Sequence, residues 1–92
     1  MMEKQNEHWE RYSEIGRRIS CYRKRSHMTQ EEMAEKLGVS RQHIGAVEAA
    51  NVKRKVSLDL LFNIADLLEV EPKYFLESQE VPFDSDKKKN AK

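Results

Sequence analysis

The segment from Gln30 to Val47 constrains the fold most, because it holds two short helical patterns joined only by Gly38 and Val39. Glycine at position 38 supplies the positive φ that a tight turn requires, without steric cost. Helices joined by so short a link cannot lie parallel, so they cross steeply, and Ala34 is the small residue that a close crossing needs. We interpret the segment as a helix-turn-helix motif; an ordinary helical hairpin is the alternative.

Capping residues fall where this interpretation needs them. Thr29 precedes the first motif helix as an N-cap, and Glu32 three positions later completes a capping box. Ser40 caps the second motif helix, in which Ile44 and Val47 form the inward stripe. The other side of that helix is therefore left for solvent or a ligand.

Apolar residues at helical spacing continue on both sides of the motif. Before it, the pattern consists of Trp9, Tyr12, Ile15, Ile19 and Tyr22, so a first helix can begin well before residue 15 and should end near residues 25–26. After it, Ser57 caps a fourth helix with an apolar stripe of Leu58, Leu61, Phe62, Ile64, Ala65 and Leu68. A short fifth helix opens at Glu71-Pro72, with proline at its first position and Tyr74, Phe75 and Leu76 as its apolar content.

We therefore predict an all-α protein, a compact bundle of five helices with a helix-turn-helix at helices 2 and 3. Residues 15–77 form the domain. Residues 1–14 are an N-terminal extension that can continue the first helix, and residues 78–92 are a polar tail that we expect to be largely disordered.

Charge is distributed unevenly along the chain, although the net charge is only +1. Residues 17–57 carry ten cations against four glutamates, a net charge of +6, whereas residues 58–83 carry a net charge of −5. A basic middle segment can present one face to a polyanion such as DNA. Charges scattered over solvated helices are the alternative.

Other classes of function have little support in the sequence. No run approaches the roughly 20 apolar residues of a membrane span, and the single cysteine, Cys21, fits a reducing, cytoplasmic setting. The histidines at positions 8, 27 and 43 show no metal-ligand spacing, so we expect neither a metal nor a cofactor. Without a glycine-rich phosphate loop or a nucleophile motif, we also expect no enzymatic activity.

Residues 15–76 resemble the lambda-repressor-like helix-turn-helix family, also called the Xre or Cro/CI type. The resemblance is carried by residues 28–42 (MTQEEMAEKLGVSRQ), 56–61 (VSLDLL) and 71–76 (EPKYFL). It implies a five-helix bundle that binds operator DNA, usually as a dimer, and controls transcription.

The exposed side of the second motif helix supplies the candidate base contacts, because the N-terminal half of that helix enters the major groove. These are Arg41, Gln42, Gly45 and Ala46. Arg41 can donate to two acceptors on guanine, or instead to a phosphate, and Gln42 can pair with adenine. Ala46 can contact a thymine methyl group.

Further residues are candidates for backbone contacts and for supporting structure. The resemblance implies a phosphate contact from Gln30, and it implies that Arg23 is buried against Glu48 as a structural ion pair. The family usually has glycine where this chain has Ala50, so the second motif helix can run one residue longer. The candidate backbone contacts are Thr29, Gln30, Ser40, His43, Asn51, Lys53, Arg54 and Lys55.

A single unit of this size covers about half of an operator, so we expect a homodimer that reads two half-sites about 34 Å apart. The candidate dimer surface is Leu60, Leu67, Tyr74, Phe75, Leu76, Val81 and Phe83, unless these residues complete the monomer core. Our leading hypothesis is a repressor of phage or mobile-element type. An activator, with contacts from Glu31, Glu32 and Glu35, and an antitoxin or protein-interaction module are the alternatives.

Overall fold

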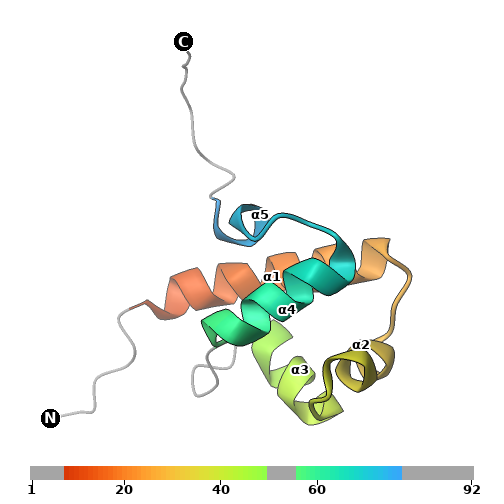
Figure 1. Ribbon diagram of the computed structural model, residues 1–92. Coiled ribbons are helices and arrows are strands. Elements are labelled where there is room, and N and C mark those ends of the chain that lie inside the picture. Colours follow the sequence, from red (N-terminus) through yellow and green to blue (C-terminus); the bar gives the residue numbers. More distant parts are fainter. Residues whose placement is uncertain (1–7, 50–55, 78–92) are drawn as a thin grey trace, which may run out of the picture.

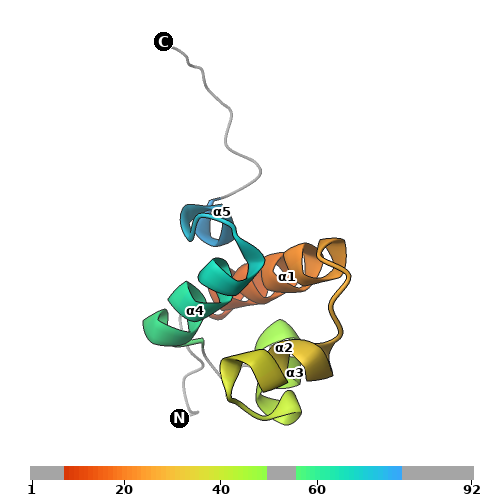
Figure 2. The ribbon, with the colours of Figure 1, turned by 45° about the vertical axis from the view of Figure 1, so that its right-hand side comes forward.

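The computed structural model describes residues 8–49 and 56–77, and these form five α-helices (Figure 1). They are α1 (Trp9–Arg25), α2 (Gln30–Leu37), α3 (Arg41–Glu48), α4 (Leu58–Leu68) and α5 (Lys73–Leu76). In Figures 1 and 2, α2 and α3 lie together on one side of α1, and α5 lies on the other side. The all-α prediction is confirmed, and α1 continues upstream of Ile15 into the segment that the sequence set apart as an extension.

Several predictions from the sequence fall outside the described residues. They concern residues 1–7 of the extension, the candidate contacts Asn51, Lys53, Arg54 and Lys55, and the tail with Val81 and Phe83. The effect of Ala50 on the end of α3 also falls there, although α3 itself ends at Glu48 with Ala49 as its C-cap.

Local hydrogen bonds fix the ends of the motif helices as the sequence predicted. The amide of Glu32 donates to Thr29 Oγ1 (3.0 Å) and the amide of Thr29 donates to Glu32 Oε1 (2.8 Å), which completes the capping box. Gly38 ends α2 with a φ of 72°. Ser40 accepts a hydrogen bond from the amide of His43 (3.0 Å) at the start of α3. The turn is thus determined by neighbours in sequence.

One hydrophobic core joins all five helices. Its fully or nearly fully buried members are Ile19, Met33, Ala34, Ile44, Val47, Leu60, Leu61, Ile64, Ala65, Leu68 and Phe75. Phe75 anchors the short α5, because its ring packs edge-to-face on Tyr22 of α1 with centroids 5.5 Å apart. Pro72 is the N-cap of α5 and not its first helical residue, so this helix begins at Lys73, one residue later than the sequence predicted.

The predicted stripe of α4 was wrong at three positions. Leu58 and Phe62 were expected inside but are 65 % and 46 % exposed, whereas Leu60 was expected outside and is buried. The reason is that α4 contacts both α1 and α2, so its buried arc includes Leu60 and Leu61 together. Leu58 and Phe62, four residues apart, share a side of the helix outside that arc. Leu60 and Phe75 are therefore core residues and cannot form a dimer surface.

Glu69 ends α4 in the left-handed conformation, with φ 59° and ψ 44°, which strains any residue that has a Cβ atom. We expect Glu69→Gly to raise the free energy of unfolding by about 0.5–1 kcal/mol, because glycine adopts this conformation without strain. Urea denaturation followed by circular dichroism measures the change. Glu69→Ala is the control, because it removes the same carboxylate but keeps the strain. Equal gains from both substitutions would attribute the effect to charge and contradict this prediction.

Candidate nucleic-acid interface

The two sides of α3 differ as a recognition helix requires. Ile44 and Val47 are buried in the core, whereas Arg41 and Gln42, in the first turn, are exposed. Two further candidate base contacts, Gly45 and Ala46, are half-buried. Because α3 is short, capped at its N-terminus by Ser40 and packed on α1 and α2, its exposed residues are presented on a rigid support.

The candidate backbone contacts at the N-termini of α2 and α3 differ in how far they are exposed. Thr29 and Ser40 are exposed, and both side-chain oxygens accept capping hydrogen bonds from backbone amides. His43 lies in the first turn of α3 and is half-buried. Helix N-termini of this kind attract phosphate groups, because their first amides have no partner within the helix.

An ion pair connects α1 to the end of α3. Arg23 donates from Nε to Glu48 Oε2 (2.7 Å) and from Nη2 to Glu48 Oε1 (3.0 Å), so the contact is bidentate. The third arm of the guanidinium, Nη1, donates to the carbonyl oxygen of Met28 (2.6 Å). Both charged side chains are more than nine-tenths buried. The pair that the resemblance implied is present, and it fixes both α3 and the turn before α2.

Gln30 is also part of this cluster, which the sequence did not predict. Its Nε2 donates to Glu48 Oε1 at 2.9 Å, so one N–H of the amide is already engaged within the protein. The side chain is half-buried. Gln30 therefore bridges α2 and α3, and any contact with DNA must use the remaining groups of the amide or the backbone.

Sequence reasoning missed Gly16, which permits the close contact between α1 and α3. A Cβ atom at position 16 would collide with the carbonyl oxygen of Val47 and would lie 3.3 Å from Glu48 Cα. A glycine in an apolar stripe gives no hydrophobic signal, and only its position inside a helical pattern could have indicated a close backbone approach.

Arg18 was missed as well. Arg18 is 5 % exposed. Its Nη1 donates to the carbonyl oxygen of Phe75 (3.5 Å), which connects α1 to α5, and its Nη2 donates to Glu14 Oε2 within α1 (3.1 Å). Two arginines of the basic middle segment, Arg18 and Arg23, are thus buried and form hydrogen bonds within the protein, so they are not available on its surface to bind a ligand. The cationic surface is smaller than the sequence count suggested.

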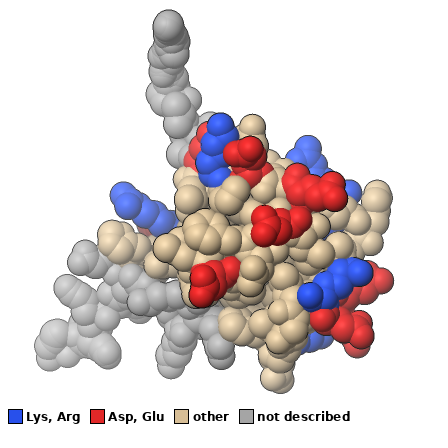
Figure 3. All heavy atoms as spheres, in the orientation of Figure 1, with Lys and Arg blue, Asp and Glu red and all other residues tan. Residues whose placement is uncertain are grey.

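Charge is mixed on the face of the molecule seen in Figure 3. Acidic side chains are scattered over α4 and α5, and both signs occur together over α2 (Figure 3). In the described part of the chain, the exposed lysines and arginines are Arg11, Arg17, Lys24, Arg25, Lys36, Arg41 and Lys73. Of these, Arg41 lies at the start of α3.

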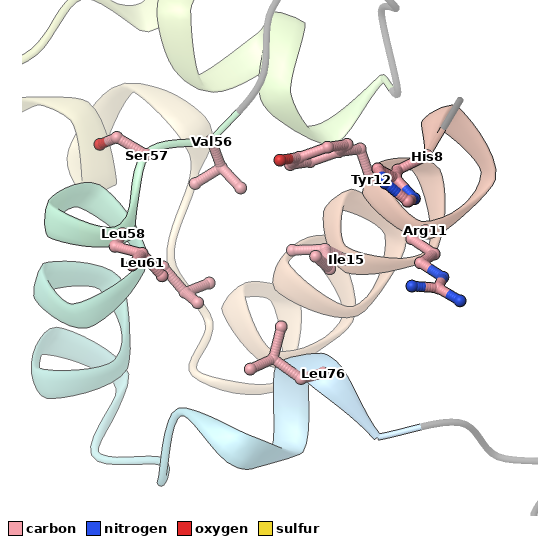
Figure 4. Close-up of a pocket in the computed structure, with 9 residues that line it drawn as sticks. All are labelled: His8, Arg11, Tyr12, Ile15, Val56, Ser57, Leu58, Leu61 and Leu76. Atoms are coloured by element: carbon pink, nitrogen blue, oxygen red, sulfur yellow. The ribbon is translucent and has the colours of Figure 1, made fainter. Parts of the chain in front are cut away.

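An apolar groove of about 480 Å³ lies apart from the motif, between the start of α1, the start of α4 and the end of α5 (Figure 4). Tyr12 and Ile15 line one side, Leu58 and Leu61 the other, and Leu76 closes the lower end in this view. The remaining lining residues are His8, Arg11, Val56 and Ser57.

The described residues contain no group of three or more histidine, cysteine or acidic side chains that could hold a metal ion. Within the same residues, no helix is both long enough and apolar enough to cross a membrane.

A family model described as helix-turn-helix matches residues 22–75, which is more than half of the chain. The match begins within α1 and ends within α5, so it includes the whole of α2, α3 and α4. A search of curated proteins found no match.

Solved structures give the same result. The restriction-modification controller protein C.AhdI from Aeromonas hydrophila is 28 % identical with a TM-score of 0.69, over 76 % of this chain and 99 % of that one. SinR, a protein of Bacillus subtilis, was solved in complex with DNA and is 32 % identical with a TM-score of 0.62, over 68 % and 98 % of the two chains. A SinR–SinI complex matches at 31 % identity and a TM-score of 0.64, over 77 % of this chain and 68 % of that one. The chain therefore belongs to the helix-turn-helix family of DNA-binding transcriptional regulators, which are not enzymes, and it has their lambda-repressor-like fold.

Proposed function

We propose that this protein is a sequence-specific repressor, of phage or mobile-element type, that binds an inverted-repeat operator as a homodimer in the cytoplasm. The observation that carries the proposal is the division of α3 into a buried side, with Ile44 and Val47, and an exposed first turn, with Arg41 and Gln42. Related SinR was solved with DNA, and related C.AhdI is a controller protein, which supports DNA binding here.

In this proposal the exposed residues of α3 contact base edges in the major groove. Arg41 donates two hydrogen bonds to guanine, and Gln42 pairs with adenine through its amide. Gly45 lets the helix approach the bases closely, and Ala46 contacts a thymine methyl group. Each good bidentate contact contributes about 1–3 kcal/mol of discrimination against a wrong base.

The remaining candidates hold the protein on the sugar-phosphate backbone. The N-termini of α2 and α3 point their free amides at phosphates, with Thr29, Gln30, Ser40 and His43 around them. The contacts proposed for Asn51, Lys53, Arg54 and Lys55 lie outside the described residues.

The proposed dimer brings two copies of α3 to successive turns of the duplex. Its surface is formed by Leu67, which is half-buried, and by the exposed Tyr74 and Leu76. Val81 and Phe83, proposed for the same surface, lie outside the described residues.

Selection from a random duplex pool tests the proposal. The wild type should enrich an inverted repeat, and Arg41→Ala/Gln42→Ala should lose that enrichment, because the variant lacks both bidentate side chains. Asn63→Ala/Asp66→Ala is the matched control, because it removes two exposed polar side chains from α4 and should enrich the same repeat as the wild type.

The same experiment can contradict the proposal in two ways. Enrichment of a single half-site would exclude the symmetric dimer. No enrichment, with only weak salt-sensitive binding to all DNA, would exclude operator reading. The second candidate function, binding of a partner protein, would then apply; it is favoured by the apolar groove beside Leu58 and Leu76, and related SinR was solved with SinI.

A further inference from the structure

We propose that Gln30, although it belongs to α2, is a specificity-determining residue: its Oε1, oriented by Glu48, accepts a hydrogen bond from a base amino group beside Gly45. This inference rests on the proposed function, because it assigns one more base contact to the same DNA surface. It differs from the phosphate contact proposed for Gln30 above, because a contact with a base distinguishes one sequence from another. A phosphate contact does not, since phosphates are the same at every base pair.

The first argument concerns the orientation of the Gln30 amide. A carboxylate can only accept hydrogen bonds, so the group of Gln30 that faces Glu48 Oε1 at 2.9 Å must be the NH2 group. Glu48 cannot turn away, because Arg23 binds both of its carboxylate oxygens and its side chain is 5 % exposed. The buried ion pair thus fixes which end of the amide faces Glu48 and leaves the carbonyl oxygen as the other end.

The second argument concerns where the other end of the amide lies. A Cβ atom built on Gly45 would meet Gln30 Oε1 at 3.7 Å, so the carbonyl oxygen lies over the backbone of α3 at this position. Gly45 follows Arg41 by four residues and therefore shares its side of the helix. Glycine has no side chain, so at this position of α3 the neighbouring polar group is the Gln30 amide of α2.

Gln30 is half-buried, and the chemistry of its Oε1 determines what this atom can recognise. A carbonyl oxygen accepts hydrogen bonds, and in the major groove the base-edge donors are the amino groups of adenine (N6) and cytosine (N4). Gln30 should therefore favour one of these two bases at a single position in each half-site. That position lies next to the bases read by the first turn of α3.

Selection with Gln30→Met tests the inference, because methionine has a similar size but cannot accept this hydrogen bond. We expect the preference for adenine or cytosine at one position per half-site to fall about tenfold or more, while the preferences at the other positions remain. Relative enrichment between sequences is compared within each variant, so a smaller folded fraction does not change the result. Asn63→Ala is the control, because it removes an exposed side-chain amide from α4, away from the proposed DNA surface, and should keep every base preference.

Two outcomes would overturn the inference. If Gln30→Met weakens binding to all sequences alike and keeps every base preference, Gln30 contacts only phosphate. If Gln30→Met keeps both affinity and preferences, Gln30 has no role at the interface. A wild type that enriches no sequence would instead contradict the proposed function itself, so the two failures are distinguishable.

Discussion

Replacing Glu48 with alanine should lower the free energy of unfolding by about 3–5 kcal/mol, because it leaves a buried charge without its partner. Arg23, nine-tenths buried, would keep only the hydrogen bond to the carbonyl oxygen of Met28. The loss should exceed that of any exposed ion pair, since exposed pairs contribute about 0–1 kcal/mol. Urea denaturation followed by circular dichroism measures the difference.

A double variant without either charge separates the loss of the ion pair from the cost of burying a lone charge. The variant Arg23→Met/Glu48→Leu should recover much of the loss, because no unpaired charge then remains in the interior. Arg17→Ala is the control: it breaks an ion pair with Glu14 in which the arginine is 61 % exposed, and it should change stability by less than about 1 kcal/mol. A Glu48→Ala variant as stable as Arg17→Ala would show that the pair does not support the fold.

Gly16→Ala should destabilise the protein by about 1–3 kcal/mol, although alanine is the better helix former by about 1 kcal/mol. The reason is that the added methyl group would collide with the carbonyl oxygen of Val47, a backbone atom that can move only if α3 moves. The same denaturation experiment measures the change, and the shift of α3 should also weaken DNA binding.

The control for this substitution is the same change at another helical glycine. Gly45→Ala places a methyl group in ordinary contact with a side-chain oxygen, so it should stabilise the protein by up to about 1 kcal/mol. Opposite signs for the two glycines would establish that contact with α3, and not helix propensity, governs position 16. A gain of stability from Gly16→Ala would contradict the close approach of α1 to α3.

The helix-turn-helix could be predicted in detail because its determinants lie within a few residues of one another. Thr29 with Glu32, Gly38 and Ser40 each act through a hydrogen bond or a backbone angle inside one turn of chain. The division of α3 into Ile44 and Val47 on one side and Arg41 and Gln42 on the other follows from helical spacing alone. The pairing of Arg23 with Glu48 had no such local signal and was implied only by resemblance to the family.

The buried side of α4 could not be predicted, because it depends on two neighbours at once. Spacing alone placed Leu58 and Phe62 inside and Leu60 outside, whereas contact with both α1 and α2 reverses these positions. The burial of Phe75 under α1 likewise removed it from the expected dimer surface. Hydrophobic spacing shows that a helix has an apolar side, but only its neighbours decide how wide that side is.

The sequence by itself thus determined the helices, the caps of α2, α3 and α4, and the turn between α2 and α3, because hydrogen bonds and backbone angles between near neighbours govern them. The tertiary structure alone decided which residues meet across helices: Gly16 under α3, Arg18 against α5, and Gln30 against Glu48. These contacts join residues far apart in the chain. Their geometry depends on how close the helices approach and at what angle, which no local pattern specifies.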